Sequence, residues 1–119
     1  MEFRLEMVTV PVSDVDRAKS FYVDQLGFAL TQDVQVDSDH RFVELAPPGS
    51  ACSIALTAGY VDSLPGSLRG AQFNVDDVDR AHAFLRSSGV HTSAVQEYPW
   101  GRFCFFSDVD GNEWSVHEV

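Results

Sequence analysis

The sequence predicts an α+β domain, residues 1–119, in which two tandem β-α-β-β-β modules form a curved, mostly antiparallel sheet trough. Three observations lead to this prediction. The segment DVDRA at 14–18 recurs unchanged at 77–81, and a repeat of this kind indicates one structural unit used twice. Apolar residues change from an alternating to a helical period and back within each half. Clusters of Pro, Gly, Asp and Ser lie between these segments and predict turns there.

The first module is expected over about residues 1–58. Partial alternation of apolar residues predicts a strand at 3–12, and Ser13 is expected to cap the helix that follows. Apolar residues at helical spacing give this helix one buried stripe, and Gly27 ends it. Three more strands are expected, at about 28–36, 40–46 and 51–58.

About residues 59–67 are expected to link the modules, because Gly59, Pro65 and Gly66 interrupt regular structure there. The second module, about 68–119, repeats the order of the first. Its expected elements are a strand at 69–75, a helix at 77–88 capped by Asp76, and strands at 91–97, 101–107 and 112–118.

Composition excludes several classes of function. Eight basic and eighteen acidic residues give a net charge of −10, which disfavours binding to nucleic acid or to an anionic membrane. No apolar run is long enough to span a membrane, and the first residues do not resemble a secretory signal. We therefore expect a soluble, cytoplasmic protein, in which Cys52 and Cys104 are buried thiols rather than a disulfide.

Several motifs resemble those of one known family. They are VTVPVSDVDRA at 8–18, VDDVDRA at 75–81 and FFSDVDGN at 105–112. With these motifs the chain resembles the vicinal oxygen chelate superfamily, which includes glyoxalase I, bleomycin-resistance proteins and extradiol dioxygenases. The resemblance covers essentially the whole chain and implies the glyoxalase-like fold. It does not fix the reaction, because one scaffold can host lyases, isomerases, oxygenases and simple binding proteins.

The resemblance also implies where a metal site would lie. The positions that hold metal ligands in the catalytic members fall here on Met7, Gly70, Ser115 and either Ser53 or Ala55. These residues do not supply the imidazole or carboxylate groups that bind divalent ions, so no metal cofactor is expected. One alternative stays open, namely a displaced site built from His117 and Gln72 with Glu44.

The pocket residues follow from strand alternation, which places residues two apart on the same face. Thr9 joins Met7 in this way, Gln72 joins Gly70, and His117 joins Ser115. Glu44 either faces solvent or lies in the trough, where a desolvated carboxylate would have a raised pKa and could act as an acid or base.

The Pro-Gly turn before the strand expected at 101–107 completes the candidate pocket. The aromatic pair Tyr98 and Trp100 forms a wall beside Arg102 for a flat aromatic or carboxylate-bearing ligand, or else Trp100 covers the core of its own module. The expected ligand pocket therefore comprises Met7, Thr9, Glu44, Ser53, Ala55, Gly70, Gln72, Trp100, Arg102, Ser115 and His117.

The function expected from these residues is metal-independent binding of a small, largely apolar organic molecule, as in the bleomycin-resistance proteins that the chain resembles. The net charge favours a cationic or neutral ligand. The alternative is a lyase, isomerase or dioxygenase-type enzyme that uses a non-standard metal site or Glu44. The resemblance further implies a homodimer in which paired sheets complete each pocket.

Overall fold

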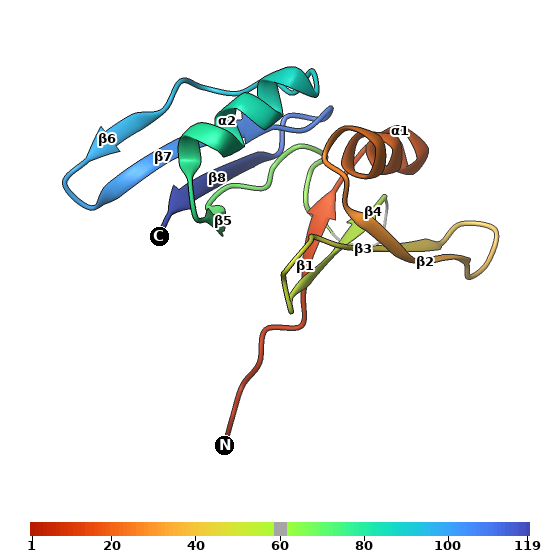
Figure 1. Cartoon of the computed structure of the whole chain (residues 1–119). Helices are drawn as coiled ribbons and strands as arrows, with labels where there is room; N and C mark the ends of the chain where they lie inside the picture. The colour runs from red at the N-terminus through yellow and green to blue at the C-terminus, as the bar shows by residue number, and fades with distance from the viewer. Residues whose placement is uncertain (59–61) are drawn as a thin grey trace.

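The computed structural model describes residues 1–58 and 62–119, so the expected break at Gly59 lies outside the described residues. The chain follows the order β-α-β-β-β twice (Figure 1). The first half contains β1 (Met7–Pro11), α1 (Val15–Ser20), the π-helical turn η1 (Phe21–Gln25), β2 (Ala29–Gln35), β3 (Arg41–Ala46) and β4 (Ser53–Thr57). The second half contains β5 (Ala71–Val75), α2 (Val78–Ser87), β6 (Gln96–Tyr98), β7 (Gly101–Ser107) and β8 (Glu113–Glu118).

The strands form two four-stranded sheets, one for each module. The strand order is β1-β4-β3-β2 in the first sheet and β5-β8-β7-β6 in the second. In both sheets the first strand runs parallel to the last, and the other pairs are antiparallel. The predicted fold class and the tandem modules are thus confirmed. The sheets are separate, and in the described residues no strand of one is hydrogen-bonded to a strand of the other.

Each helix is capped one residue later than expected. Asp14 caps α1 with its side chain, which accepts a hydrogen bond from the backbone N–H of Arg17 at 3.1 Å. Asp77 caps α2 through the equivalent bond from Arg80. The prediction of Ser13 and Asp76 as caps is therefore wrong. Ser13 is used elsewhere, because its hydroxyl donates to Asp110 Oδ1 of the second module at 2.6 Å.

Two expected strands are shorter in the structure. The strand predicted at 91–97 is reduced to β6, and before it only Thr92 pairs with β7, through an isolated bridge to Phe106. The strand predicted at 3–12 begins only at Met7. Residues 1–6 instead form an extended segment that leaves the body of the molecule (Figure 1).

One hydrophobic core spans both modules, on the faces of the sheets that the helices cover. The apolar stripes of α1 and α2 pack against strand residues such as Val43, Leu45 and Cys104. Trp114 is only 3% exposed and belongs to this core, as its position out of phase with Ser115 predicts. Both cysteines are free thiols; Cys104 is buried and Cys52 is half-buried. In the described residues no helix is long and apolar enough to cross a membrane.

A buried polar network joins the two modules inside this core. The Tyr22 hydroxyl donates to Asp108 Oδ2 at 2.7 Å and accepts a hydrogen bond from Trp114 Nε1 at 2.9 Å. Burial, followed by the nearby Asp108 carboxylate, raises the pKa of Tyr22, so its phenol stays protonated and remains a donor. Asn112 extends the network with a hydrogen bond from its Nδ2 to the carbonyl of Pro11. The modules therefore share specific bonds as well as apolar contacts.

Candidate functional site

The candidate site is a hollow of about 600 Å³ on the open face of the second sheet, opposite the face that α2 covers. This volume falls in the range of sites that bind small organic molecules, roughly 300–1,000 Å³. The hollow is lined by Gln72, Tyr98, Trp100, Phe103, Phe105, Ser115 and His117.

Strand alternation explains why these side chains share a face. In β7, Cys104 and Phe106 point into the core, so Phe103 and Phe105 point the other way. The strand register then places Phe105 opposite Ser115, and Phe103 opposite His117. Gln72 of β5 is paired with Ser115 from the other side. The open face therefore carries a continuous band of aromatic and polar groups.

The aromatic rings of the hollow form two stacked groups, and Tyr98 of one group meets Phe103 of the other at an interplanar angle of 65°. Tyr98 and Trp100 stack with ring centroids 5.1 Å apart and an interplanar angle of 4°. Phe103 stacks on Phe105 at 6.2 Å and on His117 at 4.5 Å. Trp100 is 69% exposed, so it does not cover the core of its module. Such a surface suits a ligand with a flat apolar part.

Two polar groups of the hollow are oriented by a hydrogen bond. The Ser115 hydroxyl donates to Gln72 Oε1 at 3.0 Å. Because this bond occupies the oxygen of the amide, the Gln72 amide nitrogen is directed away from Ser115 and can donate to a ligand. The Gln72 amide nitrogen therefore supplies a hydrogen-bond donor beside the aromatic rings.

Gly101 makes room for the His117 ring, and the sequence analysis did not identify this role. A Cβ at position 101 would lie 2.6 Å from His117 Nε2, and the backbone of Gly101 has φ +143°. Phe103 and Phe105 also line the hollow, although they were not among the residues expected there. Extending the alternation from Ser115 to its neighbouring strand would have found both phenylalanines.

Five of the other candidates lie on the open face of the first sheet. The register pairs Met7 with Ser53, and Ala55 with both Thr9 and Glu44. None of these five residues is part of the lining of the aromatic hollow. The structure therefore divides the expected pocket between the open faces of two sheets.

Glu44 has a lowered pKa in this position, which is the opposite of the raised pKa that a desolvated place in the trough would give it. Its Oε2 accepts a hydrogen bond from the Ser53 hydroxyl at 2.6 Å, and Gln32 Nε2 donates to its Oε1 at 3.1 Å. The bond from Ser53 is the main cause of the lowered pKa and outweighs the effect of desolvation. Glu44 is therefore a stabilised carboxylate rather than a poised acid.

Two other expected residues lie outside the hollow. Arg102 shares the face of Cys104 and forms ion pairs with Asp79 of α2, at 3.0 Å, and with Glu97 and Glu118. Its guanidinium thus ties β7 to the helix. Gly70 precedes β5 with φ +84° and does not line the hollow.

The residues at the implied metal positions do not fit a divalent ion. They offer one thioether and hydroxyls, and those of Ser53 and Ser115 already donate to Glu44 and Gln72. Across residues 1–58 and 62–119, no group of three or more His, Cys, Asp or Glu side chains is placed to hold a metal. The alternative metal site of His117, Gln72 and Glu44 is also divided between the two sheets. Gln72 and His117 line the hollow, while Glu44 lies in the first sheet.

Comparison with known proteins agrees with this architecture. The sequence profile of the Glyoxalase/Bleomycin resistance protein/Dioxygenase superfamily matches residues 4–116. The chain belongs to this superfamily. It is also 32% identical over 119 residues to the uncharacterised protein YaeR of Escherichia coli strain K12, an alignment that covers 93% of this chain and 92% of YaeR.

Solved structures of the superfamily are similar over the whole chain. TnmS3, an antibiotic binding protein from Streptomyces sp. CB03234, is 38% identical with a TM-score of 0.89, and the match covers 98% of this chain and 96% of TnmS3. A superfamily member from Sphaerobacter thermophilus DSM 20745 is 33% identical, also with a TM-score of 0.89, over 99% and 98% of the two chains.

Proposed function

We propose that this superfamily member binds a small, largely apolar organic molecule with a flat aromatic part, and that it does so without a metal ion. The aromatic hollow is the observation that carries this proposal, because two groups of stacked rings line a space of suitable volume beside oriented polar groups. The similarity to TnmS3, an antibiotic binding protein, supports the binding of a small molecule.

In the proposed complex, the flat part of the ligand stacks on Trp100 and Tyr98 and covers Phe105. The Gln72 amide and the His117 ring give the ligand its orientation through hydrogen bonds. A cationic or neutral ligand is favoured, since the net charge of −10 disfavours an anion.

The proposal includes a homodimer, in which the open face of the first sheet in one chain closes the hollow of its partner. The division of the expected pocket between two sheets supports this arrangement, because the first sheet carries a polar pair, Glu44 and Ser53, that the hollow itself lacks. This carboxylate would complement a cationic ligand.

Removing the exposed indole tests the site. Trp100→Ala is expected to weaken the binding of proflavine, a flat cationic dye, by about tenfold or more, because the variant loses both stacking and buried area. Dye fluorescence measures the affinity. Leu64→Ala is the matched control, since Leu64 is an exposed apolar residue that does not line the hollow. Equal affinities of wild type and Trp100→Ala would contradict the site.

Metal independence is tested on the same samples. Dialysis against EDTA is expected to leave the dye affinity unchanged, and adding zinc, nickel, manganese or iron(II) is expected not to increase it. A loss of binding in EDTA that a single metal restores would contradict this part of the proposal and would favour an enzyme with a non-standard metal site.

A further inference from the structure

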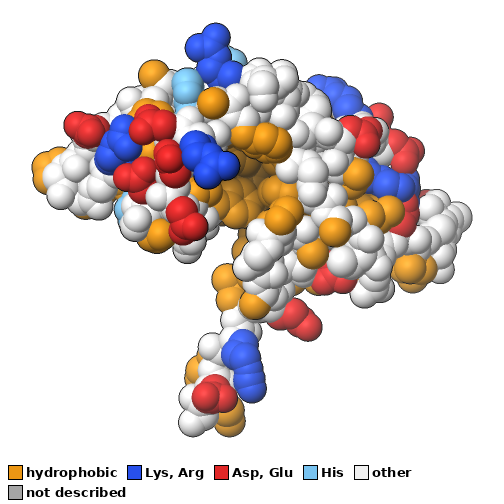
Figure 2. Space-filling view, viewed as in Figure 1, with side chains coloured by type: hydrophobic (Ala, Val, Ile, Leu, Met, Phe, Trp, Pro, Cys, Tyr) orange, Lys and Arg blue, Asp and Glu red, His pale blue; other side chains and the backbone are white. Residues whose placement is uncertain are grey.

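We propose that the protein has a second ligand site, which takes a single-ring aromatic molecule with a short cationic tail. The site is an apolar groove between the two modules, with a volume of about 170 Å³. Its walls include Phe28, Pro48, Phe73, Phe84 and Leu85. Figure 2 shows hydrophobic side chains gathered in a hollow between the two halves. An apolar cavity of about 150 Å³ in another protein binds benzene, so the groove has a suitable size for one ring.

The groove is separate from the aromatic hollow, because the two lie on opposite faces of the second sheet. Phe105 lines the hollow, and the next residue, Phe106, lines the groove. Ser115 and Val116 are divided in the same way, as the alternation of side chains along a strand requires. A ligand in the groove therefore leaves the hollow open to a second molecule.

Aromatic packing fixes the floor of the groove. The Phe73 ring stacks on Phe106, with centroids 6.3 Å apart and an interplanar angle of 7°, and on Trp114 at 4.7 Å. Phe28 meets the Phe73 ring in a T-shaped contact at 5.8 Å. Trp114 is itself held by the hydrogen bond from its Nε1 to the Tyr22 hydroxyl. Because these rings are already ordered, a flat ring that packs on them pays little for ordering the protein.

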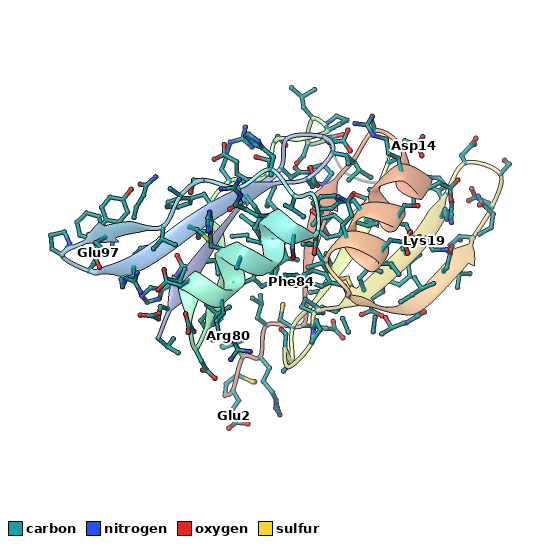
Figure 3. The ribbon with its side chains drawn as sticks, turned by 45° about the horizontal axis from the view of Figure 1, so that its top comes forward. Glu2, Asp14, Lys19, Arg80, Phe84 and Glu97 are labelled. Atoms are coloured by element: carbon teal, nitrogen blue, oxygen red, sulfur yellow. The ribbon has the colours of Figure 1, made fainter. Side chains whose placement is uncertain are left out.

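The internal repeat explains why this groove is open while its counterpart in the other half is closed. In α1, Arg17 Nη2 donates to the Val109 carbonyl in the last turn of the second module, at 2.7 Å. The equivalent residue of α2 is Arg80, which Figure 3 shows one turn before Phe84, and the equivalent turn joins β3 to β4 at 47–50. Two prolines of that turn line the groove, and within residues 1–58 and 62–119 no hydrogen bond joins the turn to Arg80. The space that a polar contact closes in one half therefore stays available to an apolar ring in the other.

The border of the groove is negative and favours a cation. Asp76, Asp77 and Arg80 line a shallow hollow that adjoins the groove, so two carboxylates face one guanidinium there. The start of α2 does not offset this charge, because two of its first N–H groups already donate to carboxylates. The Val78 N–H donates to Glu118 Oε1 at 3.0 Å, and the Arg80 N–H donates to Asp77 Oδ1 at 3.1 Å. An ammonium group on a short tail can thus lie beside Asp76 while its ring stays in the groove.

Fluorine NMR at neutral pH with para-fluorophenethylamine, a single ring with a two-carbon ammonium tail, tests the site. The wild type is expected to bind this probe with a Kd of about 1 mM or below. Ala81→Leu, which fills the groove, is expected to weaken binding about tenfold or more. Ala83→Leu is the matched control, because Ala83 is exposed on the same helix and does not line the groove. Phe84→Ala removes a half-exposed wall without filling the groove and is expected to weaken binding about threefold or more.

Two further comparisons separate the groove from the aromatic hollow and test the charge of the ligand. Trp100→Ala is expected to leave the affinity for the fluorinated amine unchanged, and Ala81→Leu is expected to leave the affinity for proflavine unchanged. The anion para-fluorohydrocinnamate is expected to bind the wild type about threefold more weakly than the amine or worse, and Asp76→Asn is expected to reduce this difference. Equal amine affinities of Ala81→Leu and Ala83→Leu, loss of amine binding in Trp100→Ala, or a preference for the anion would each overturn the second site.

Discussion

Gly66→Ala is expected to destabilise the fold by about 3 kcal/mol or more, because two independent penalties add at this position. Gly66 has φ +80°, and a Cβ there would lie 2.0 Å from the backbone carbonyl oxygen of Asp110. Its backbone N–H also donates to the Pro11 carbonyl at 3.0 Å. The linker is therefore held against both modules at one point, and urea unfolding followed by circular dichroism measures the loss.

Gly49→Ala is the matched control for this variant. Gly49 has φ +81°, almost the same backbone conformation, but a Cβ there would meet no atom within 4 Å. Only the cost of the left-handed backbone is expected, about 1–2 kcal/mol. Equal losses of stability in the two variants would contradict the close contact between Gly66 and Asp110.

Asn112→Ala is expected to cost about 2–4 kcal/mol, since it leaves several buried groups without partners. Asn112 is fully buried, and its Nδ2 donates to the Pro11 carbonyl at 2.9 Å and to Asp108 Oδ2 at 2.8 Å. Its Oδ1 accepts a hydrogen bond from the Leu68 backbone N–H at 3.0 Å. The side chain thus joins the first module, the start of the second module at Leu68 and the last turn.

The control is Asn74→Ala, the same change on an exposed position of β5. It is expected to change the free energy of unfolding by less than about 0.5 kcal/mol. Calorimetry is the measurement, because the unfolding enthalpy also reports whether the two modules still unfold in one transition. An Asn112→Ala protein as stable as the Asn74→Ala control would contradict the structural role of the network.

The repeat made the architecture predictable, because two copies of DVDRA fix two helices in equivalent places. The caps were misplaced by one residue for a physical reason. Ser13 and Asp14 are both good caps, and so are two successive aspartates before α2, so residue type alone does not choose between neighbours. For α1, the hydroxyl of Ser13 is occupied by a distant contact, the bond to Asp110, which local sequence does not reveal.

The site was less predictable than the fold. Alternation correctly predicts which side chains of one strand share a face, and it therefore places Ser115 and His117 together. It does not say which sheet a strand of the other module joins, and for that reason Glu44 and Gln72 were expected in one pocket. The pKa of Glu44 depends on a hydrogen bond from Ser53, on a neighbouring strand, which periodicity cannot show.

The most direct test of the account is a nitrogen–proton NMR titration of the protein with proflavine in the presence of EDTA. The shifts are expected to concentrate on the indole N–H of Trp100, the side-chain amide of Gln72 and the backbone N–H groups of β7 and β8. Saturable shifts at these positions would establish a metal-free aromatic site on the second sheet. Shifts confined to residues elsewhere, or binding that appears only when a metal is added, would contradict the proposed function.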